Sequence, residues 1–250
     1  MWSGMIVMNE IISKKLLIRY ITYLIVGIYS VFLYIDLSSK NLENNFTIYL
    51  KYFIIVLCFI LTLLIGKEGY GKADSILVNA ARFFTLIADY YLLIASNYKL
   101  GILCFCVVQI IYILRHTLKK KNKFMNLIFL IFAVTIGLIL SVIINLKNIE
   151  GQLLKISLIY ASLLISSLYC SFTIAKSSLY NVCSAVFIEI GMFLFFMCDL
   201  NVGLFNTLEN TELRFLTGFL IWFFYAPSQL LLSFSGYNGD YLKQVFSHKG

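Results

Sequence analysis

The sequence is poor in charged residues and in proline, and each shortage excludes a class of protein. Only 13% of its 250 residues are charged, whereas soluble domains carry about 25%. A single proline, Pro227, interrupts the chain, so its apolar runs are almost free of helix breakers. These runs leave no room for a separate soluble domain, which excludes a soluble enzyme, a nucleic-acid reader and a disordered scaffold.

The signatures of metal and nucleophilic catalysis are also absent. There is no HExxH, GxSxG or Walker loop. The two histidines, His116 and His248, fall at predicted membrane edges, so neither a histidine-rich metal site nor a Ser-His-Asp triad can form near the carboxylates. We interpret the six cysteines, none in a CxxC pair, as small buried apolar residues: Cys58, Cys104, Cys106, Cys170, Cys183 and Cys198. Carboxylates remain for chemistry, without a metal or an organic cofactor.

Apolar residues dominate the composition of the chain. They make up 61% of the chain, and the mean hydropathy of +0.90 is typical of a membrane protein. Because the runs are continuously apolar rather than alternating, they predict helices rather than a barrel. We expect an all-α polytopic membrane protein with one transmembrane domain over residues 1–250. Its bundle of eight transmembrane helices is predicted at about 16–35, 48–65, 76–95, 100–115, 124–145, 152–175, 180–200 and 213–234.

The net charge of +8 sits between these runs and predicts the orientation of the chain. With eight spans, 14 of the 20 Lys and Arg residues fall on the side of the N-terminus. The positive-inside rule then places both termini in the cytoplasm. The basic residues anchor anionic lipid headgroups rather than nucleic acid. The richness in Ile, Lys, Asn, Phe and Tyr is compatible with an AT-rich genome, and so with a bacterial cytoplasmic membrane.

Four ionisable residues stand out inside the predicted spans: Arg82, Asp89, Glu189 and Asp199. A charge at the centre of a bilayer costs about 3 kcal/mol or more, so each needs a reason. Asp89 and Asp199 lie in the third and seventh helices, which run in the same direction. Both carboxyl groups therefore lie toward the same, non-cytoplasmic end, and a shared site is geometrically possible.

Polar residues recur at helical spacing on two of these helices. The third helix carries Arg82, Thr85, Asp89 and Ser96, and the eighth carries Trp222, Tyr225, Gln229 and Ser233. Such stripes either hold helices together by hydrogen bonds or line a site in the bundle interior.

We interpret three further residues, Glu189, Arg82 and His116, one by one. Glu189 is either a proton carrier or a neutral acid bonded to a neighbour. Arg82 snorkels, pairs with an aspartate or holds a phosphate. His116 is expected at the membrane surface among lysines.

Four short motifs resemble the YhhN-like lysoplasmalogenase family. Ala88-Asp89 followed by Tyr-Tyr-Leu-Leu is similar to the GD-x-x-L motif of that family. The spacing G-x3-F-x3-H-x2-Y recurs at Gly101, Phe105, Gln109 and Tyr112, with glutamine in place of histidine. The spacing G-x3-F-x2-S-D recurs at Gly191, Phe195, Cys198 and Asp199, with cysteine in place of serine. Tyr225 to Gln229 is similar to a Y-x-x-x-Q segment.

The resemblance implies an eight-helix membrane enzyme that hydrolyses the vinyl ether bond of a lysoplasmalogen. Proton addition to the β-carbon of a vinyl ether creates an oxocarbenium ion, which water captures. This needs one protonated carboxylic acid and one carboxylate, as in other two-carboxylate sites. We assign these roles to Asp89 and Asp199, facing one interior cavity. Substrate-binding roles fall to Gln109, Tyr112, Tyr225, Gln229 and Thr85.

The expected partner is a lysophospholipid-like lipid that enters sideways from the membrane. Its phosphate would meet Lys99 or Tyr98. The alternative is a non-enzymatic transporter or binding protein for lipids or small molecules, because buried carboxylates also serve proton-coupled transport. A third class is an assembly factor without chemistry.

Overall fold

A computed structural model describes residues 2–42, 44–120, 124–146, 151–174 and 177–247. Within these ranges the chain is helical and contains no strand, only an isolated bridge between Gly69 and Tyr237. The long helices are α1 (Trp2–Ser39), α2 (Asn45–Leu63), α3 (Lys72–Asp89), α4 (Tyr98–His116), α5 (Phe124–Leu146), α6 (Gln152–Phe172), α7 (Val182–Thr207) and α8 (Thr211–Phe234). Short elements in the described ranges are a 3-10 turn η1 (Gly66–Glu68), a π-helix η2 (Tyr90–Ile94) and α9 (Gly239–Phe246).

The all-α membrane fold is confirmed, but not the count of eight spans. Among the described residues, seven helices are long and apolar enough to cross a membrane. The exception is α5, of which only a shorter apolar part, Ile128–Ile139, is distinguished. The span predicted at 124–145 therefore stays a prediction, although a helix is present there.

Asparagine residues set the starts of five helices. The side chains of Asn44, Asn97, Asn181, Asn210 and Asn238 each accept a backbone N–H from the first turn of α2, α4, α7, α8 and α9, respectively. Asparagine is among the best residues at this position because its short side chain satisfies a donor that the helix itself leaves unpaired. These polar caps delimit the apolar runs at the surface of the bundle.

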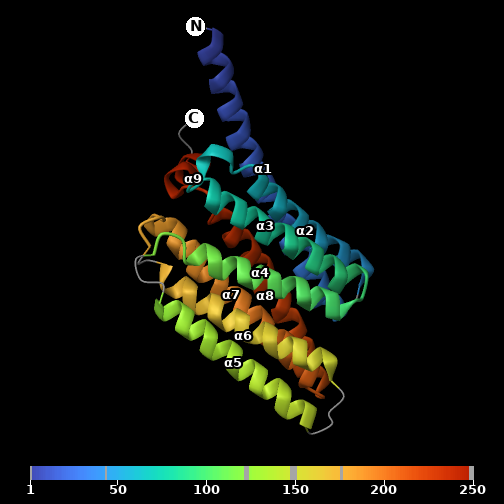
Figure 1. The fold of residues 1–250 in the computed structure, drawn as a ribbon. Helices are drawn as coiled ribbons and strands as arrows, with labels where there is room; N and C mark the ends of the chain where they lie inside the picture. Colours follow the sequence, from blue (N-terminus) through green and yellow to red (C-terminus); the bar gives the residue numbers. More distant parts are fainter. Residues whose placement is uncertain (1, 43, 121–123, 147–150, 175–176, 248–250) are drawn as a thin grey trace.

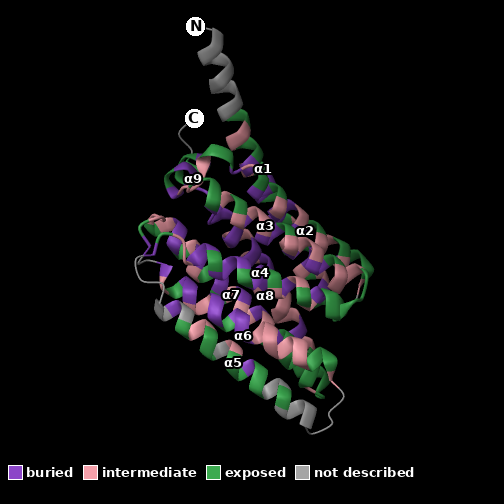
Figure 2. Cartoon of the chain, in the orientation of Figure 1, coloured by how far each residue is buried: buried purple, intermediate pink, exposed green. Residues whose placement is uncertain are grey.

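The helices form one bundle whose interior lies between α3, α4, α7 and α8 (Figure 1). α7 packs most extensively against α8, and α3 against α4. Buried positions concentrate where α4, α7 and α8 meet, whereas exposed positions follow the outer faces (Figure 2). Those outer faces carry many large apolar side chains, such as Ile76, Phe132 and Leu216. An apolar outer surface of this kind is what contact with lipid requires.

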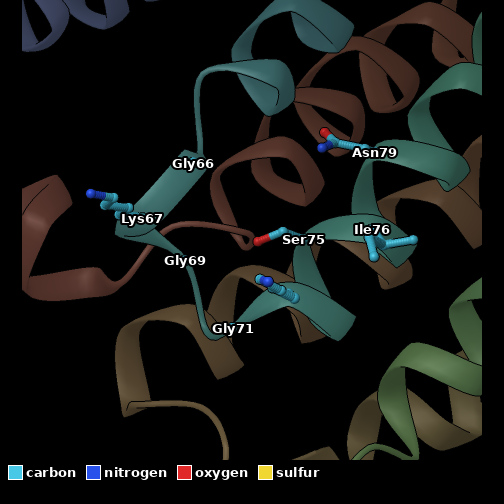
Figure 3. A pocket seen from close by; sticks show the side chains of 8 residues that line it. Gly66, Lys67, Gly69, Gly71, Ser75, Ile76 and Asn79 are labelled. Carbon is cyan, nitrogen blue, oxygen red and sulfur yellow. The ribbon is translucent and has the colours of Figure 1, made fainter.

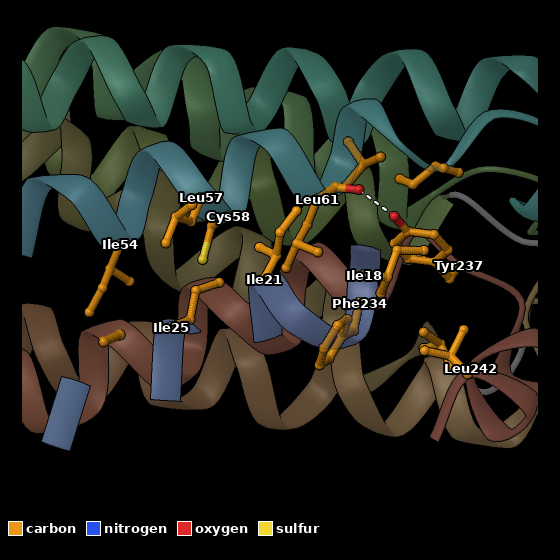
Figure 4. Packing of buried hydrophobic residues seen from close by; sticks show 14 of the residues in the cluster. Ile18, Ile21, Ile25, Ile54, Leu57, Cys58, Leu61, Phe234, Tyr237 and Leu242 are labelled. Carbon is orange, nitrogen blue, oxygen red and sulfur yellow. Dashed lines mark hydrogen bonds between the residues drawn. The ribbon is translucent and has the colours of Figure 1, made fainter. Parts of the chain in front are cut away.

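α9 and the start of the bundle close one end of the structure. Arg19 donates a hydrogen bond to the Val245 carbonyl at 2.9 Å, and Lys15 donates one to Gln244 at 2.9 Å. Behind them the Tyr237 hydroxyl bonds the Leu61 carbonyl, and apolar residues of α1, α2, α8 and α9 pack around it (Figure 4). α9 and the N-terminal part of α1 therefore lie at the same end of the bundle (Figure 1).

Candidate functional site

Asp89 is the last residue of α3, immediately before the π-helix η2. Only 3% of it is exposed. The Tyr225 hydroxyl on α8 donates a hydrogen bond to its Oδ2 at 2.6 Å. The extra residue per turn of a π-helix is a common feature of functional sites, and here it re-aims the chain directly after a buried carboxyl group.

Asp199 lies on α7 and is partly buried. The Tyr160 hydroxyl, on α6, donates a hydrogen bond to its Oδ2. Each aspartate is thus held by one tyrosine from a neighbouring helix, and the two arrangements are alike although four different helices supply them.

Aromatic rings connect the two Asp–Tyr pairs. The Phe105 ring lies 6.1 Å from the Tyr160 ring and 6.5 Å from the Tyr225 ring, measured between centroids. Phe195 packs edge-on against both Phe105 and Tyr225. The prediction that both carboxyl groups face one cavity is not tested by these contacts.

Gln109 belongs to the Asp199 side of this arrangement. It is fully buried on α4, and its Oε1 accepts a hydrogen bond from Ser167 at 2.5 Å. Its Nε2 is buried without a hydrogen-bond partner among the described residues. The bond from Ser167 holds the amide oxygen and leaves the amide nitrogen free to donate, as an orienting group can.

Arg82 forms a second interior network with two other predicted site residues. Its guanidinium donates to the Gln229 side chain and to the Tyr112 hydroxyl, and all three side chains are fully buried. These contacts differ from snorkelling and from an ion pair with an aspartate, whereas a phosphate held by Arg82 stays a prediction. Thr85, also buried, donates to its own helix at the Ala81 carbonyl. Direct substrate contact by Tyr112, Gln229 and Thr85 stays a prediction.

His116 and Arg115 lie inside the bundle, which corrects the prediction that His116 lies at the membrane surface. His116 is fully buried, and its ring stacks on Tyr112 at 5.4 Å. Arg115 pairs with Asp74 at 2.8 Å and donates to the Ser235 carbonyl at 2.9 Å. His248 lies outside the described residues.

Tyr180 completes the network around Asp74. Its hydroxyl donates to Asp74 Oδ1. Tyr180 lies between α6 and α7, outside the spans, and burial raises its pKa, so the phenol keeps the proton that it donates.

Tyr160 and Ser167 are the site residues that the sequence did not identify. Both lie on α6 and face α4 or α7. Their spacing of seven residues places them on one face of the helix. The signal was present in the serine-rich stretch from Ser162 to Ser171, but α6 contains no carboxyl group to draw attention to it.

Two cavities open near the ends of α3. One, of about 540 Å³, lies beyond Asp89 and is lined by Lys51, Leu92, Tyr98 and Trp222, among others. The Trp222 ring contacts that of Tyr225, which bonds Asp89. The other, of about 440 Å³, lies at the opposite end of α3. Neither aspartate lines either cavity.

Lys51 joins α2 to the end of α1. It pairs with Asp36 at 2.6 Å, and both side chains are at most 2% exposed. The Asp36 Oδ1 atom has no hydrogen-bond partner. Lys99, which was predicted with Tyr98 as a contact of the substrate phosphate, donates to Gln152 at 2.8 Å. Across the described ranges, no three His, Cys, Asp or Glu side chains lie together as a metal site requires.

Comparison with known protein families gives one match. The model of the YhhN family matches residues 46–236, a stretch that includes both Asp–Tyr pairs and the Arg82 network. No curated protein and no solved structure matches the chain. Since the matched stretch covers well over half of the sequence, this chain belongs to the YhhN family.

Proposed function

We propose that this protein is a membrane-embedded hydrolase that cleaves the vinyl ether bond of lysoplasmalogen-type lysophospholipids. The observation that carries the proposal is the pair of interior carboxyl groups, Asp89 and Asp199, each held by one tyrosine hydroxyl beside a shared aromatic cluster. Helix packing alone does not require a carboxyl group, whereas acid–base chemistry on an ether does.

The reaction uses the two carboxyl groups in different protonation states. The protonated aspartate gives its proton to the β-carbon of the vinyl ether, and an oxocarbenium ion forms. The ionised aspartate takes a proton from water as the water oxygen attacks that cation. The resulting hemiacetal breaks into a fatty aldehyde and a glycerophospho-alcohol. General acid–base assistance of this kind contributes about 10²–10⁴-fold to a rate.

The 540 Å³ cavity suits the polar part of the substrate. It lies next to η2, directly beyond Asp89, and Trp222 connects it to Tyr225. Tyr98 in its wall offers a donor to a phosphate group, beside the Lys51 ammonium group that is paired with Asp36. A headgroup seated there would place the alkenyl chain toward Phe105 and Phe195, which line the interior between the two aspartates.

Aldehyde release from a lysoplasmalogen by the purified protein tests this function. We expect the wild-type protein to form aldehyde, with a slower rate in D₂O because a proton reaches carbon in the slow step. Asp89→Asn and Asp199→Asn should each lower turnover by about 10²-fold or more, while the unfolding midpoint shows that both variants fold.

Glu189→Gln is the matched control, because it removes a carboxyl group from α7 that is only partly buried and lies ten positions before Asp199. Its turnover should equal that of the wild type. Unchanged aldehyde formation in both aspartate variants would refute the catalytic assignment. A folded wild-type protein that forms no aldehyde with several headgroups would instead support transport or binding of a lipid.

A further inference from the structure

The cavity at the start of α3 has no part in the proposed hydrolysis. It measures about 440 Å³ and opens where the segment Gly66-Lys67-Glu68-Gly69-Tyr70-Gly71-Lys72 leads into the helix. Asp89 is at the other end of α3, so about 25 Å of helix separates it from Lys72. Figure 3 shows the three glycines along the loop, with Ser75 and Asn79 on the helix that follows.

The first turn of α3 offers unpaired backbone donors to this cavity. Its N-cap is Gly71, which has no side chain to accept a hydrogen bond, whereas five other helices begin with a capping asparagine. Gly71 has a φ of 108°, a conformation that other residues rarely adopt, and nothing lies within 4 Å of where a Cβ would be. The loop therefore holds the helix N-terminus open.

The charge around the cavity is positive. Lys67 and Lys72 line it, both are exposed, and neither has a hydrogen-bond or ion-pair partner among the described residues. The Lys14 Nζ lies beside the loop, where it donates to the Ile65 carbonyl at 3.3 Å. Asp74, in the first turn of α3, is neutralised by Arg115, and no carboxylate is among the lining residues.

Two polar side chains in the cavity wall lack partners. The Ser75 Oγ and the Asn79 Oδ1 are both buried and make no hydrogen bond. Ser75 points toward the loop at Gly69, and a Cβ on that glycine would lie 2.9 Å from its hydroxyl oxygen (Figure 3). A buried hydroxyl group normally has a partner, because leaving it unpaired costs about 1–3 kcal/mol.

We propose that this cavity binds a phosphate group, with the backbone N–H groups of the first turn of α3, Lys67, Lys72 and the Ser75 hydroxyl as donors. A glycine-rich loop before a helix N-terminus is a recurrent way to hold phosphate, because the N–H groups and the helix dipole both favour an anion. The group comes from the headgroup of an anionic phospholipid or from a free phosphate compound, which offer the same oxygen atoms.

Two measurements distinguish these sources without using hydrolysis. In the first, inorganic phosphate is titrated into detergent-purified protein at constant ionic strength, and the unfolding midpoint is followed. In the second, native mass spectrometry counts the lipids retained from nanodiscs with phosphatidic acid or with phosphatidylcholine. A ligand that binds only the folded protein raises the midpoint with its concentration.

The variant Lys67→Gln/Lys72→Gln should weaken binding about tenfold or more, and Ser75→Ala should weaken it less. Lys243→Gln is the control, because Lys243 is an exposed lysine on α9 at the same end of the bundle. A midpoint that rises with phosphate identifies a free compound, and retention of phosphatidic acid alone identifies a lipid. No effect of either probe, or an equal loss in Lys243→Gln, overturns the proposal.

Discussion

Two tyrosine hydroxyl groups hold the aspartates of the proposed active site. Tyr225 donates to Asp89 at 2.6 Å, and Tyr160 donates to Asp199. A hydrogen bond to a charged group contributes about 1.5–3 kcal/mol. We therefore expect Tyr225→Phe and Tyr160→Phe each to lower the turnover number for aldehyde release by about 10–100-fold, since phenylalanine keeps the ring packing and removes only the donor.

Tyr29→Phe provides the comparison for both variants. The Tyr29 hydroxyl donates to the Phe223 carbonyl at 2.9 Å in an exposed position and touches neither aspartate. Its turnover should match that of the wild type. If Tyr225→Phe kept full turnover, Asp89 would need no positioning by Tyr225.

The buried pair of Arg115 and Asp74 is a stability element rather than a part of the candidate site. Both side chains are fully inaccessible, and Arg115 also binds Ser235. Arg115→Gln leaves a carboxylate without its cation, so we expect the free energy of unfolding to fall by about 3–5 kcal/mol. Chemical unfolding in detergent measures this loss.

Adding Asp74→Asn to Arg115→Gln removes the unpaired charge. The double variant should therefore have a higher free energy of unfolding than Arg115→Gln alone. Arg214→Gln is the control, because Arg214 is exposed and lies over the Phe205 ring. An Arg115→Gln protein as stable as Arg214→Gln would contradict this interpretation.

At the scale of helices, Gly101 lets α4 approach the π-helix. A Cβ at this position would lie 2.5 Å from a Leu92 methyl group and 3.2 Å from the Ala88 carbonyl. Gly101→Ala therefore has to displace η2 next to Asp89, and we expect it to lower stability by about 1–3 kcal/mol. The shift of the thermal unfolding midpoint measures the cost.

Gly203→Ala on α7 makes the same change in open space, with nothing within 4 Å of the added methyl group. Alanine favours a helix over glycine, so its midpoint should equal or exceed that of the wild type. Equal midpoints for the two alanine variants would show that η2 can move without a loss of stability.

The helices could be predicted from the sequence because apolar runs and their length carry the signal. Each predicted range overlaps one observed helix, and 213–234 falls within two residues of α8 at its start. The π-helix could not be predicted, because Tyr90 to Ile94 is an ordinary apolar continuation of α3 and only packing against Gly101 distinguishes it.

The candidate site was predictable only where a charge in an apolar run marked it. Asp89 and Asp199 stand out for this reason, and Tyr225 follows from helical spacing. Tyr160 on α6 does not stand out, since a tyrosine in a membrane helix is common. The inward direction of Arg115 depends on Asp74, which is distant in sequence. His116 stacks on Tyr112, one turn earlier on the same helix, but nothing in the sequence shows that this face of α4 is buried.

The structure shows which exposed positions suit a test of how the whole molecule is oriented in the membrane. Lys67 is exposed in η1, beside the N-terminal part of α1, and Lys119 is exposed just after the end of α4. Lys99 is exposed at the opposite end of α4. If both termini are cytoplasmic, a membrane-impermeant maleimide added to intact cells should label Lys99→Cys but neither Lys67→Cys nor Lys119→Cys. The reverse pattern would invert the topology.

Lys120 is unsuitable for this experiment. It is buried, and its ammonium group donates to the Cys170 carbonyl at 3.0 Å. The six native cysteines are buried or partly buried and carry no disulfide. A variant without the new cysteine therefore gives the background labelling.

The ion pair between Lys51 and Asp36 bears on how the chain enters the membrane during synthesis. Each charge alone opposes insertion of its helix, by up to about 3 kcal/mol at the bilayer centre. Because the pair joins the end of α1 to the beginning of α2 at 2.6 Å, the two helices enter the lipid at lower cost together than one after the other. We expect the insertion machinery to release them as one hairpin, after Lys51 has left the ribosome and met its partner.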